Sequence, residues 1–283
     1  MLTIPASDFS LTESLECGQA FRWRRLPAGG YDGWIDGRTV KVHQHGSTLT
    51  VESLDPVLTP QRVSQYFALD LDLASVLSSI DVDGQIHEAI GRHRGLRVLR
   101  QEPWECLVAF ICSSYNNIKR IQGMIERLAQ AYGTAVGFNG FRGYTMPAPE
   151  AIAAASERDL RALGLGFRAA YLKATARMIA NGALPLDALR RASYPAAKTA
   201  LMQCDGVGDK VADCVALFGL EQYEAFPIDL WIERAMRYYF RRQRLSPKRI
   251  HEFARRHFGP HAGYAQQYLY HDVRSARRAA RVA

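Results

Sequence analysis

The sequence predicts an α+β fold in which a small N-terminal antiparallel sheet lies on a mainly helical body of two lobes, with a cleft between the lobes. Apolar and polar residues alternate in the segments 38–43 and 47–51, which Gly turns bound, as in half-buried strands. After Pro60 the apolar residues recur at helical spacing. We therefore expect an antiparallel β domain with a flanking helix at residues 1–95 and a helical domain at residues 96–283.

The remaining elements are predicted in chain order. The segment from Leu2 to about Thr59 is expected to contain strands and turns. The stretch 133–149 is expected to be a loop at a subdomain junction, because it is rich in the breakers glycine and proline. Two helices joined by a glycine hairpin are predicted at about 198–220, and a frayed basic tail is predicted from Arg274 onward.

Composition favours a globular protein with an anionic partner. The chain has 283 residues, 48% of them hydrophobic, which is enough to bury a large core. Its net charge of +8 is unevenly placed: from Arg234 to the end there are thirteen Lys/Arg against two acids, Glu252 and Asp272. Such a basic region favours a polyanion, although a solvated surface accounts for a charge run equally well.

Other features of the sequence exclude several classes of protein. The five cysteines are an odd number without C-x-x-C spacing, which argues against a disulfide framework and a zinc site. The histidines show no H-E-x-x-H pattern, so no metal is expected. The sequence contains no apolar run of about 18 residues and no signal-peptide pattern. We expect a monomer in the cytoplasm of a prokaryote or elsewhere inside a cell, neither secreted nor membrane-bound.

A glycine turn followed by a lysine is the first candidate for a functional site. Gly206 and Gly208 lie between two helical patterns, and such a turn leaves backbone N–H groups free to hold a phosphate. The following helix is predicted to start near Asp209 as its N-cap, which puts Lys210 in the first turn. The helix dipole disfavours a positive charge there by roughly 0.3–1 kcal/mol. Lys210 is therefore either a phosphate clamp or an amine kept partly neutral for nucleophilic attack.

An aspartate nineteen positions later is the second candidate. Asp229 follows the extended stretch fixed by Pro227 and precedes an amphipathic helix, so we expect it to be an N-cap. Taken alone, Asp229 is explained by capping and Lys210 by solvation or phosphate binding. Their combination on a glycine hairpin and a later helix start indicates an active site.

This combination resembles the helix-hairpin-helix DNA glycosylases, whose lysine-bearing members are bifunctional glycosylase/lyases. Four further segments look like the matching parts of the 8-oxoguanine DNA glycosylase family, in the same order: 17–23, 107–118, 163–171 and 259–266. Together with the hairpin they extend the resemblance over nearly the whole chain. The resemblance implies double-stranded DNA containing 8-oxoguanine as the substrate and a flipped target base.

The resemblance also implies catalytic and base-recognition roles. Lys210 would attack C1′ of the damaged nucleotide and form a Schiff base, while Asp229 would stabilise the developing sugar cation. Gly18 would accept a hydrogen bond from N7–H, which 8-oxoguanine has and guanine lacks. Gln266 would read the Watson–Crick edge. The ring would lie between two further residues, Cys214 and Tyr270, although a small buried hydrophobe explains Cys214 equally well.

The DNA-binding roles implied by the family fall into three groups. Tyr115 and Phe167 would be wedges that fill the space of the flipped base. Arg120 and Arg168 would contact the orphaned cytosine. The hairpin and the neighbouring helix would bind phosphates through Gly206, Gly208 and Trp231. Taken alone, Phe167 is better explained by core packing than as a wedge. No cofactor is required and no iron–sulfur cluster is expected. The hairpin carbonyls of Met202, Cys204 and Val207 are candidate ligands for a structural monovalent or divalent cation.

The sequence departs from better-known members of the family, and two alternative functions stay open. Tyr115 stands where asparagine is usual, so the preference for cytosine opposite the lesion is not fixed by the resemblance. A monofunctional glycosylase for alkylated purines would use Asp229 with water, and Lys210 argues against it. A non-catalytic DNA-binding module would leave the joint presence of Lys210, Asp229, Gly18 and Gln266 unexplained.

Overall fold

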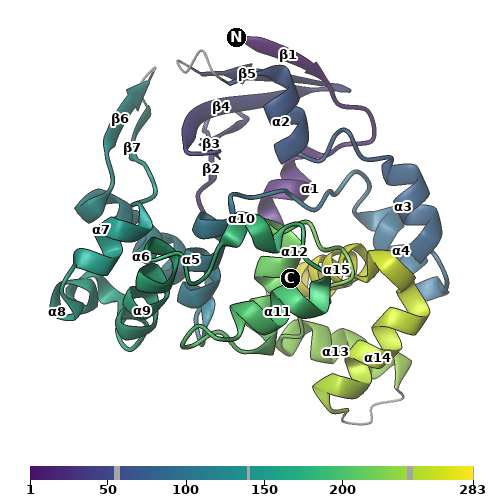
Figure 1. The fold of residues 1–283 in the computed structure, drawn as a ribbon. Helices are drawn as coiled ribbons and strands as arrows, with labels where there is room; N and C mark the ends of the chain where they lie inside the picture. Colours follow the sequence, from purple (N-terminus) through teal and green to yellow (C-terminus); the bar gives the residue numbers. More distant parts are fainter. Residues whose placement is uncertain (54–57, 139–140, 241–244, 283) are drawn as a thin grey trace.

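Five antiparallel strands form the N-terminal sheet in the order β1-β5-β4-β3-β2 (Figure 1). A computed structural model describes residues 1–53, 58–138, 141–240 and 245–282. The strands are β1 (Leu2–Pro5), β2 (Arg24–Arg25), β3 (Tyr31–Ile35), β4 (Arg38–His45) and β5 (Thr48–Glu52). The two segments predicted as strands are thus confirmed as β4 and β5.

The turns and the alternation of side chains fix the register of this sheet. Asp36 and Gly37 both have positive φ, the conformation of the two-residue turn that joins twisted strands, and they pair Ile35 with Arg38 across the turn. Val42 and Val51 are paired across β4 and β5 and fully buried. These side chains form a core of their own beneath the sheet.

The helical body follows the sheet and forms two groups in Figure 1, with α6 to α9 on one side and α3, α4 and α13 to α15 on the other. Its helices are α2 (Pro60–Tyr66), α3 (Leu73–Ile80), α4 (Gly84–Arg92), α5 (Pro103–Ser113), α6 (Ile118–Tyr132), α7 (Pro149–Ala154), α8 (Glu157–Leu160), α9 (Arg168–Ala180), α10 (Leu186–Leu189), α11 (Tyr194–Leu201), α12 (Asp209–Gly219), α13 (Leu230–Tyr239), α14 (Pro247–Phe258) and α15 (Ala262–Val282). The mainly helical body is confirmed.

Helix α5 is the centre of the main core. Nine of its eleven residues are buried, and it packs against α12 through Phe110 and Phe218, whose rings stack at 5.5 Å. The core extends from α5 into both groups of helices and includes α3 and α4. Helices α5 and α12 therefore form the rigid support for any residue at their ends.

Three expectations from the sequence are wrong. The stretch 133–149 is not only a loop, because β6 (Ala135–Phe138) and β7 (Phe141–Tyr144) pair in antiparallel register within it. Leu11–Glu16 forms a short helix, α1, whose N-terminus is capped by the Ser10 hydroxyl. The chain beyond Arg274 is not a frayed tail but continues α15 to Val282.

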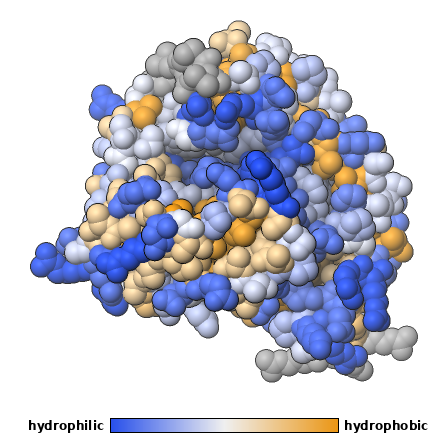
Figure 2. Space-filling model, viewed as in Figure 1, coloured by the Kyte–Doolittle hydropathy of each residue, from blue (hydrophilic) through white to orange (hydrophobic). Residues whose placement is uncertain are grey.

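The surface shows a polar hollow between the sheet and the helical body (Figure 2). Charged side chains of both units line it, including Arg38, Arg62 and Glu102. None of the predicted site residues lines this hollow. In the described ranges no helix combines the length and the apolar character that a membrane span requires.

Candidate active site

The glycine hairpin joins α11 to α12 and leaves the start of α12 without a side-chain cap among the described residues. Gly206 has a φ of +76°, and a Cβ there would lie 2.2 Å from Cδ2 of Tyr171, so glycine is required. Gly208, and not Asp209, precedes the first helical residue, which corrects the predicted N-cap. The Asp209 carboxylate instead pairs with Lys198 at 3.1 Å. The uncapped N–H groups suit a phosphate.

Lys210 lies in the first turn of α12, as predicted, and its amine reaches the end of α5. Its Nζ donates to the Ser113 hydroxyl at 2.9 Å and lies 5.2 Å from the centre of the Phe110 ring. The Ser113 hydroxyl in turn donates to the Phe110 carbonyl at 2.7 Å. No ion pair of Lys210 occurs within the described residues. The amine is thus half-buried beside a hydroxyl and an aromatic face.

Asp229 is the N-cap of α13, as predicted. Its Oδ1 accepts hydrogen bonds from the backbone N–H groups of Trp231 and Ile232, both at 2.9 Å. Both bonds use the same oxygen, so the capping role fixes the orientation of the carboxylate and leaves Oδ2 outside the cap. The local geometry therefore holds a charged oxygen at a defined position next to the helix start.

Cys214 lies one turn after Lys210 on α12 and is 3% exposed. Burial raises the pKa of its thiol to about 12, while the charge of Lys210 opposes this shift and that of Asp229 adds to it. Lys210 and Asp229 therefore both act on the same buried thiol, which stays protonated. Cys214 is therefore a small neutral group rather than a nucleophile.

Gly18 lies against α15 in a conformation that favours glycine. Its φ is +86°, and a Cβ there would lie 2.9 Å from Nη1 of Arg274 and 3.2 Å from the Tyr270 hydroxyl. The segment is tied to α15 because Gln267 donates to the Cys17 carbonyl at 3.2 Å. Burial raises the pKa of Tyr270, and the charge of Arg274 opposes this shift. Gly18 and Tyr270, predicted as base readers, are thus neighbours.

Gln266 is 4% exposed and half of its amide has no partner. Its Nε2 donates to the Pro227 carbonyl at 3.1 Å, two residues before Asp229, while its Oε1 is buried without a hydrogen bond from any described residue. Buried carbonyl oxygens are nearly always hydrogen-bonded in proteins. The unpaired oxygen is therefore able to accept a hydrogen bond from a bound group.

The two predicted wedges are exposed aromatic side chains. Tyr115 is 97% exposed with a φ of +49°, an uncommon conformation for a bulky residue, directly after α5. Phe167 is 44% exposed and precedes α9. Exposed aromatic residues at such positions are available for contact with another molecule.

The two predicted arginine contacts differ from each other. Arg120 is exposed in the first turn of α6. Arg168 is 8% exposed, and its guanidinium donates to the carbonyls of Ser114 and Leu165 and stacks on the Phe167 ring at 4.4 Å. Arg168 therefore supports the segment that carries Tyr115, and a contact with an orphaned cytosine would require its present hydrogen bonds to be exchanged.

Trp231 follows the Asp229 cap, and cations lie near its ring. The guanidinium groups of Arg234 and Arg277 lie 4.8 Å and 5.5 Å from the ring centre. This arrangement places positive charge at the start of α13, where an anion also benefits from the helix dipole. The position is compatible with the predicted phosphate contact.

Two neighbours of the site were not predicted from the sequence. The Ser113 hydroxyl accepts a hydrogen bond from the Lys210 amine, but no feature of the sequence distinguishes Ser113 from the adjacent Ser114. Arg274 lies next to Gly18 and four residues after Tyr270 on α15. That helical spacing was a signal that could have found Arg274.

The fold and this geometry define the class of helix-hairpin-helix DNA glycosylases, in agreement with the resemblance of the sequence. Residues 108–279 match the family described as HhH-GPD superfamily base excision DNA repair protein, and residues 1–107 match the 8-oxoguanine DNA glycosylase N-terminal domain. The chain belongs to the 8-oxoguanine DNA glycosylase family of the HhH-GPD superfamily.

Similar proteins support this assignment along the full chain. The N-glycosylase/DNA lyase OGG1 of Arabidopsis thaliana is 31% identical over 95% of this chain and 78% of its own length. The 8-oxoguanine glycosylase/lyase of Clostridium acetobutylicum, solved with double-stranded DNA containing cytosine opposite 8-oxoguanine, has a TM-score of 0.91 and 31% identity over 98% of this chain and 99% of its own. MBOgg1, solved with a low-affinity DNA ligand, has a TM-score of 0.92 and 35% identity over 96% and 94% of the two chains.

Proposed function

We propose that this protein is a bifunctional DNA glycosylase and abasic-site lyase that removes 8-oxoguanine from double-stranded DNA. The observation that carries the proposal is that the Lys210 amine is held by the Ser113 hydroxyl without an ion pair among the described residues, while the Asp229 carboxylate is fixed as the cap of α13. The family assignment and the relatives named N-glycosylase/DNA lyase support the same activity. Action on DNA requires a location inside the cell, and we propose the cytoplasm of a prokaryote. We also propose that the protein is a monomer.

Recognition of the damaged base would use the unpaired amide oxygen of Gln266. This buried acceptor suits a donor on the Watson–Crick edge of a flipped purine. The carbonyl of Gly18 would accept the N7–H of 8-oxoguanine, and Tyr270 beside it would stack on the ring. Undamaged guanine would leave the Gly18 carbonyl without a donor, at a cost of about 1–3 kcal/mol.

Lys210 would act as the nucleophile of base removal. The neutral amine attacks C1′, a C1′–N bond to the lysine forms, and the bond from C1′ to the base breaks with the electron pair leaving on the base. The charge of Asp229 stabilises the positive charge that develops on the sugar during this step. A hydroxyl and a ring face surround the amine, and neither holds the ammonium as strongly as a carboxylate partner would.

Strand cleavage would follow from the same covalent bond. Opening of the sugar ring converts the lysine adduct into a Schiff base, in which C1′ is doubly bonded to the nitrogen. Loss of a proton from C2′ then expels the 3′ phosphate by β-elimination. These steps require no cofactor. We also propose that the backbone carbonyls of Met202, Cys204 and Val207 bind a structural cation.

The test of the activity is borohydride trapping on a duplex with one 8-oxoguanine. We expect a covalent adduct with the wild type, none with Lys210→Gln, and an unchanged yield with Lys248→Gln. Lys248 is the matched control because it is also a lysine in the first turn of a helix, on the exposed surface of α14. Base release without an adduct would overturn the lyase mechanism, and binding without release would overturn the enzyme assignment.

Opposite-base preference is tested by the same assay with each of the four bases across from the lesion. Tyr115 offers no amide to an orphaned cytosine, and the guanidinium of Arg168 is engaged by backbone carbonyls. We therefore expect a weaker preference for cytosine than a site with a free arginine and an asparagine would have. Strict dependence on cytosine would show that Arg168 rearranges when DNA binds.

A further inference from the structure

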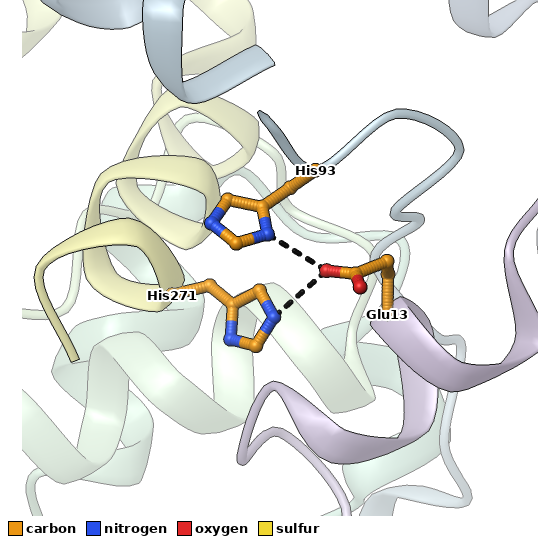
Figure 3. A group of neighbouring side chains, drawn as sticks. All are labelled: Glu13, His93 and His271. Carbon is orange, nitrogen blue, oxygen red and sulfur yellow. Dashed lines mark hydrogen bonds and ion pairs between the residues drawn. The ribbon is translucent and has the colours of Figure 1, made fainter. Parts of the chain in front are cut away.

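Two histidine side chains meet at one carboxylate oxygen of Glu13 (Figure 3). Oε2 of Glu13, on α1, lies 2.7 Å from Nδ1 of His93, the residue after α4, and 2.9 Å from Nε2 of His271 on α15. These three atoms lie within 4.8 Å of one another. Both histidines are 8% exposed, so the cluster is largely shielded from water.

A carboxylate also lies behind one of the histidines. Nε2 of His93, on the far side of the ring from Glu13, is 3.5 Å from Oδ1 of Asp272. Asp272 is itself held by two hydrogen bonds from Arg92, at 2.6 Å and 3.0 Å. Nε2 of His93 makes no hydrogen bond to a described residue in this structure, but Asp272 lies near it, and a carboxylate that receives the second N–H is the usual support of a metal-binding histidine.

We propose that Glu13, His93 and His271 form a binding site for a divalent first-row transition-metal ion. Two imidazole nitrogens and one carboxylate oxygen are a donor set that such ions prefer. The sequence predicts no such site, because its histidines form no local motif. The fold assembles this set from positions 80 and 258 residues away from Glu13.

Two of the three donor separations are close to those of neighbouring ligands around a six-coordinate ion. Neighbouring ligands around a six-coordinate ion with bonds of about 2.1 Å lie ~3.0 Å apart, whereas tetrahedral ligands lie about 3.3 Å apart. The two contacts of the Glu13 oxygen, 2.7 Å and 2.9 Å, need to open by only a few tenths of an ångström for the former. Co²⁺, Ni²⁺, Fe²⁺ and Mn²⁺ fit this geometry, with water completing the shell.

Metal binding replaces protons that the cluster holds without metal. Nδ1 of His93 and Nε2 of His271, the nitrogens that would bind the ion, both face the Glu13 oxygen, so binding has to displace any proton shared with that carboxylate. Burial, with the nearby His93, lowers the pKa of His271, which keeps the ring in the neutral form that binds metal.

The ion would join the two segments that carry the base readers. Glu13 is five residues before Gly18, and His271 directly follows Tyr270. Without metal these segments are also linked by Arg274, which donates to the Glu16 carbonyl at 3.4 Å. A metal ion across them would hold Gly18 and Tyr270 at a fixed separation. This consequence rests on the proposed function, whereas metal binding itself does not.

The test is a titration of the full, chelator-treated chain with CoCl₂, without DNA, followed by calorimetry. We expect one Co²⁺ per chain in the wild type. Glu13→Gln and His271→Gln are expected to weaken binding by well over tenfold, and Asp272→Asn by about 10–100-fold because it supports a ligand only indirectly. The matched control is His87→Gln, because His87 is an exposed histidine paired with Asp81 at 2.9 Å and should leave binding unchanged.

Two outcomes would overturn the proposal. One is the absence of stoichiometric Co²⁺ binding to the wild type, which would leave the cluster as a hydrogen-bonded ion pair only. The other is equal loss of binding in the control variant His87→Gln and in His271→Gln. Circular dichroism distinguishes loss of ligands from loss of fold, and a Tm of the wild type that rises with CoCl₂ gives an independent reading that needs no variant. Borohydride trapping reports separately on the proposed enzyme activity.

Discussion

Substitution of Asp229 separates its charge from its role as a helix cap. Its Oδ1 accepts two backbone N–H bonds at 2.9 Å at the start of α13. An asparagine oxygen can accept the same bonds and is an equally good N-cap, whereas alanine cannot. The two variants Asp229→Asn and Asp229→Ala therefore share the loss of charge and differ only in the cap.

The magnitudes follow from these contacts. Loss of the cap costs about 1 kcal/mol, so Asp229→Ala should melt roughly 2–4 °C below Asp229→Asn. Loss of the charge removes about 0.3–1 kcal/mol of interaction with the helix dipole from both variants. The same loss should slow base excision by about 10²–10⁴-fold in both, because the sugar cation loses its stabilising carboxylate.

The assays are thermal unfolding and single-turnover excision of 8-oxoguanine from a duplex. Equal melting temperatures of the two variants would show that the hydrogen bonds to Trp231 and Ile232 contribute nothing to stability. Excision by Asp229→Asn within threefold of the wild-type rate would refute the role of the charge. The pair of variants thus tests the structural and the chemical reasoning independently.

Three further predictions concern single contacts. Ser113→Ala removes the hydroxyl that accepts a hydrogen bond from the Lys210 amine at 2.9 Å. We expect excision to slow by about tenfold, as for a hydrogen bond worth ~1.5 kcal/mol. An unchanged single-turnover rate would show that other contacts position the amine. Gly206→Ala should lower the Tm by roughly 2–4 °C more than Gly182→Ala. Both glycines have positive φ, but only at Gly206 would a Cβ meet an aromatic ring, at 2.2 Å. Equal shifts of the Tm in the two variants would contradict this. Burial lowers the pKa of His251 from 6.5 to about 4 in the folded chain. As the pH falls, His251 is therefore protonated in the unfolded chain before it is protonated in the folded chain. The contribution of His251 to the free energy of unfolding is lost as the pH falls from 6.5 towards 4. His251→Gln should therefore gain stability relative to the wild type between pH 7 and pH 5 in urea unfolding, and a difference that does not change with pH would rule this out.

Features set by neighbouring residues could be predicted from the sequence. Asp229 follows a proline and precedes an apolar helical pattern, and Lys210 follows a glycine turn, so both positions were correct. The short helix α1 was missed although Ser10 and Glu13 have the spacing of a capping box. The prediction of Asp209 as the N-cap was wrong, because its carboxylate forms an ion pair with a lysine on the preceding helix.

Features set by distant residues could not be predicted. Ser113 and Lys210 are 97 residues apart, and only the packing of α5 against α12 brings them together. The strands β6 and β7 contain Gly137 and Gly143, which weaken a strand pattern, and are stabilised by pairing with each other. Arg168 is buried because a carbonyl 54 residues earlier accepts its hydrogen bonds.

The burial of every cysteine bears on survival under oxidative stress. All five thiols are buried and free, and burial raises the pKa of Cys17 to about 11 and of Cys112 and Cys214 to about 12. Peroxides attack the exposed thiolate, and these thiols are neither exposed nor ionised. The conditions that generate oxidised guanine are therefore ones in which these five buried thiols resist attack by peroxide.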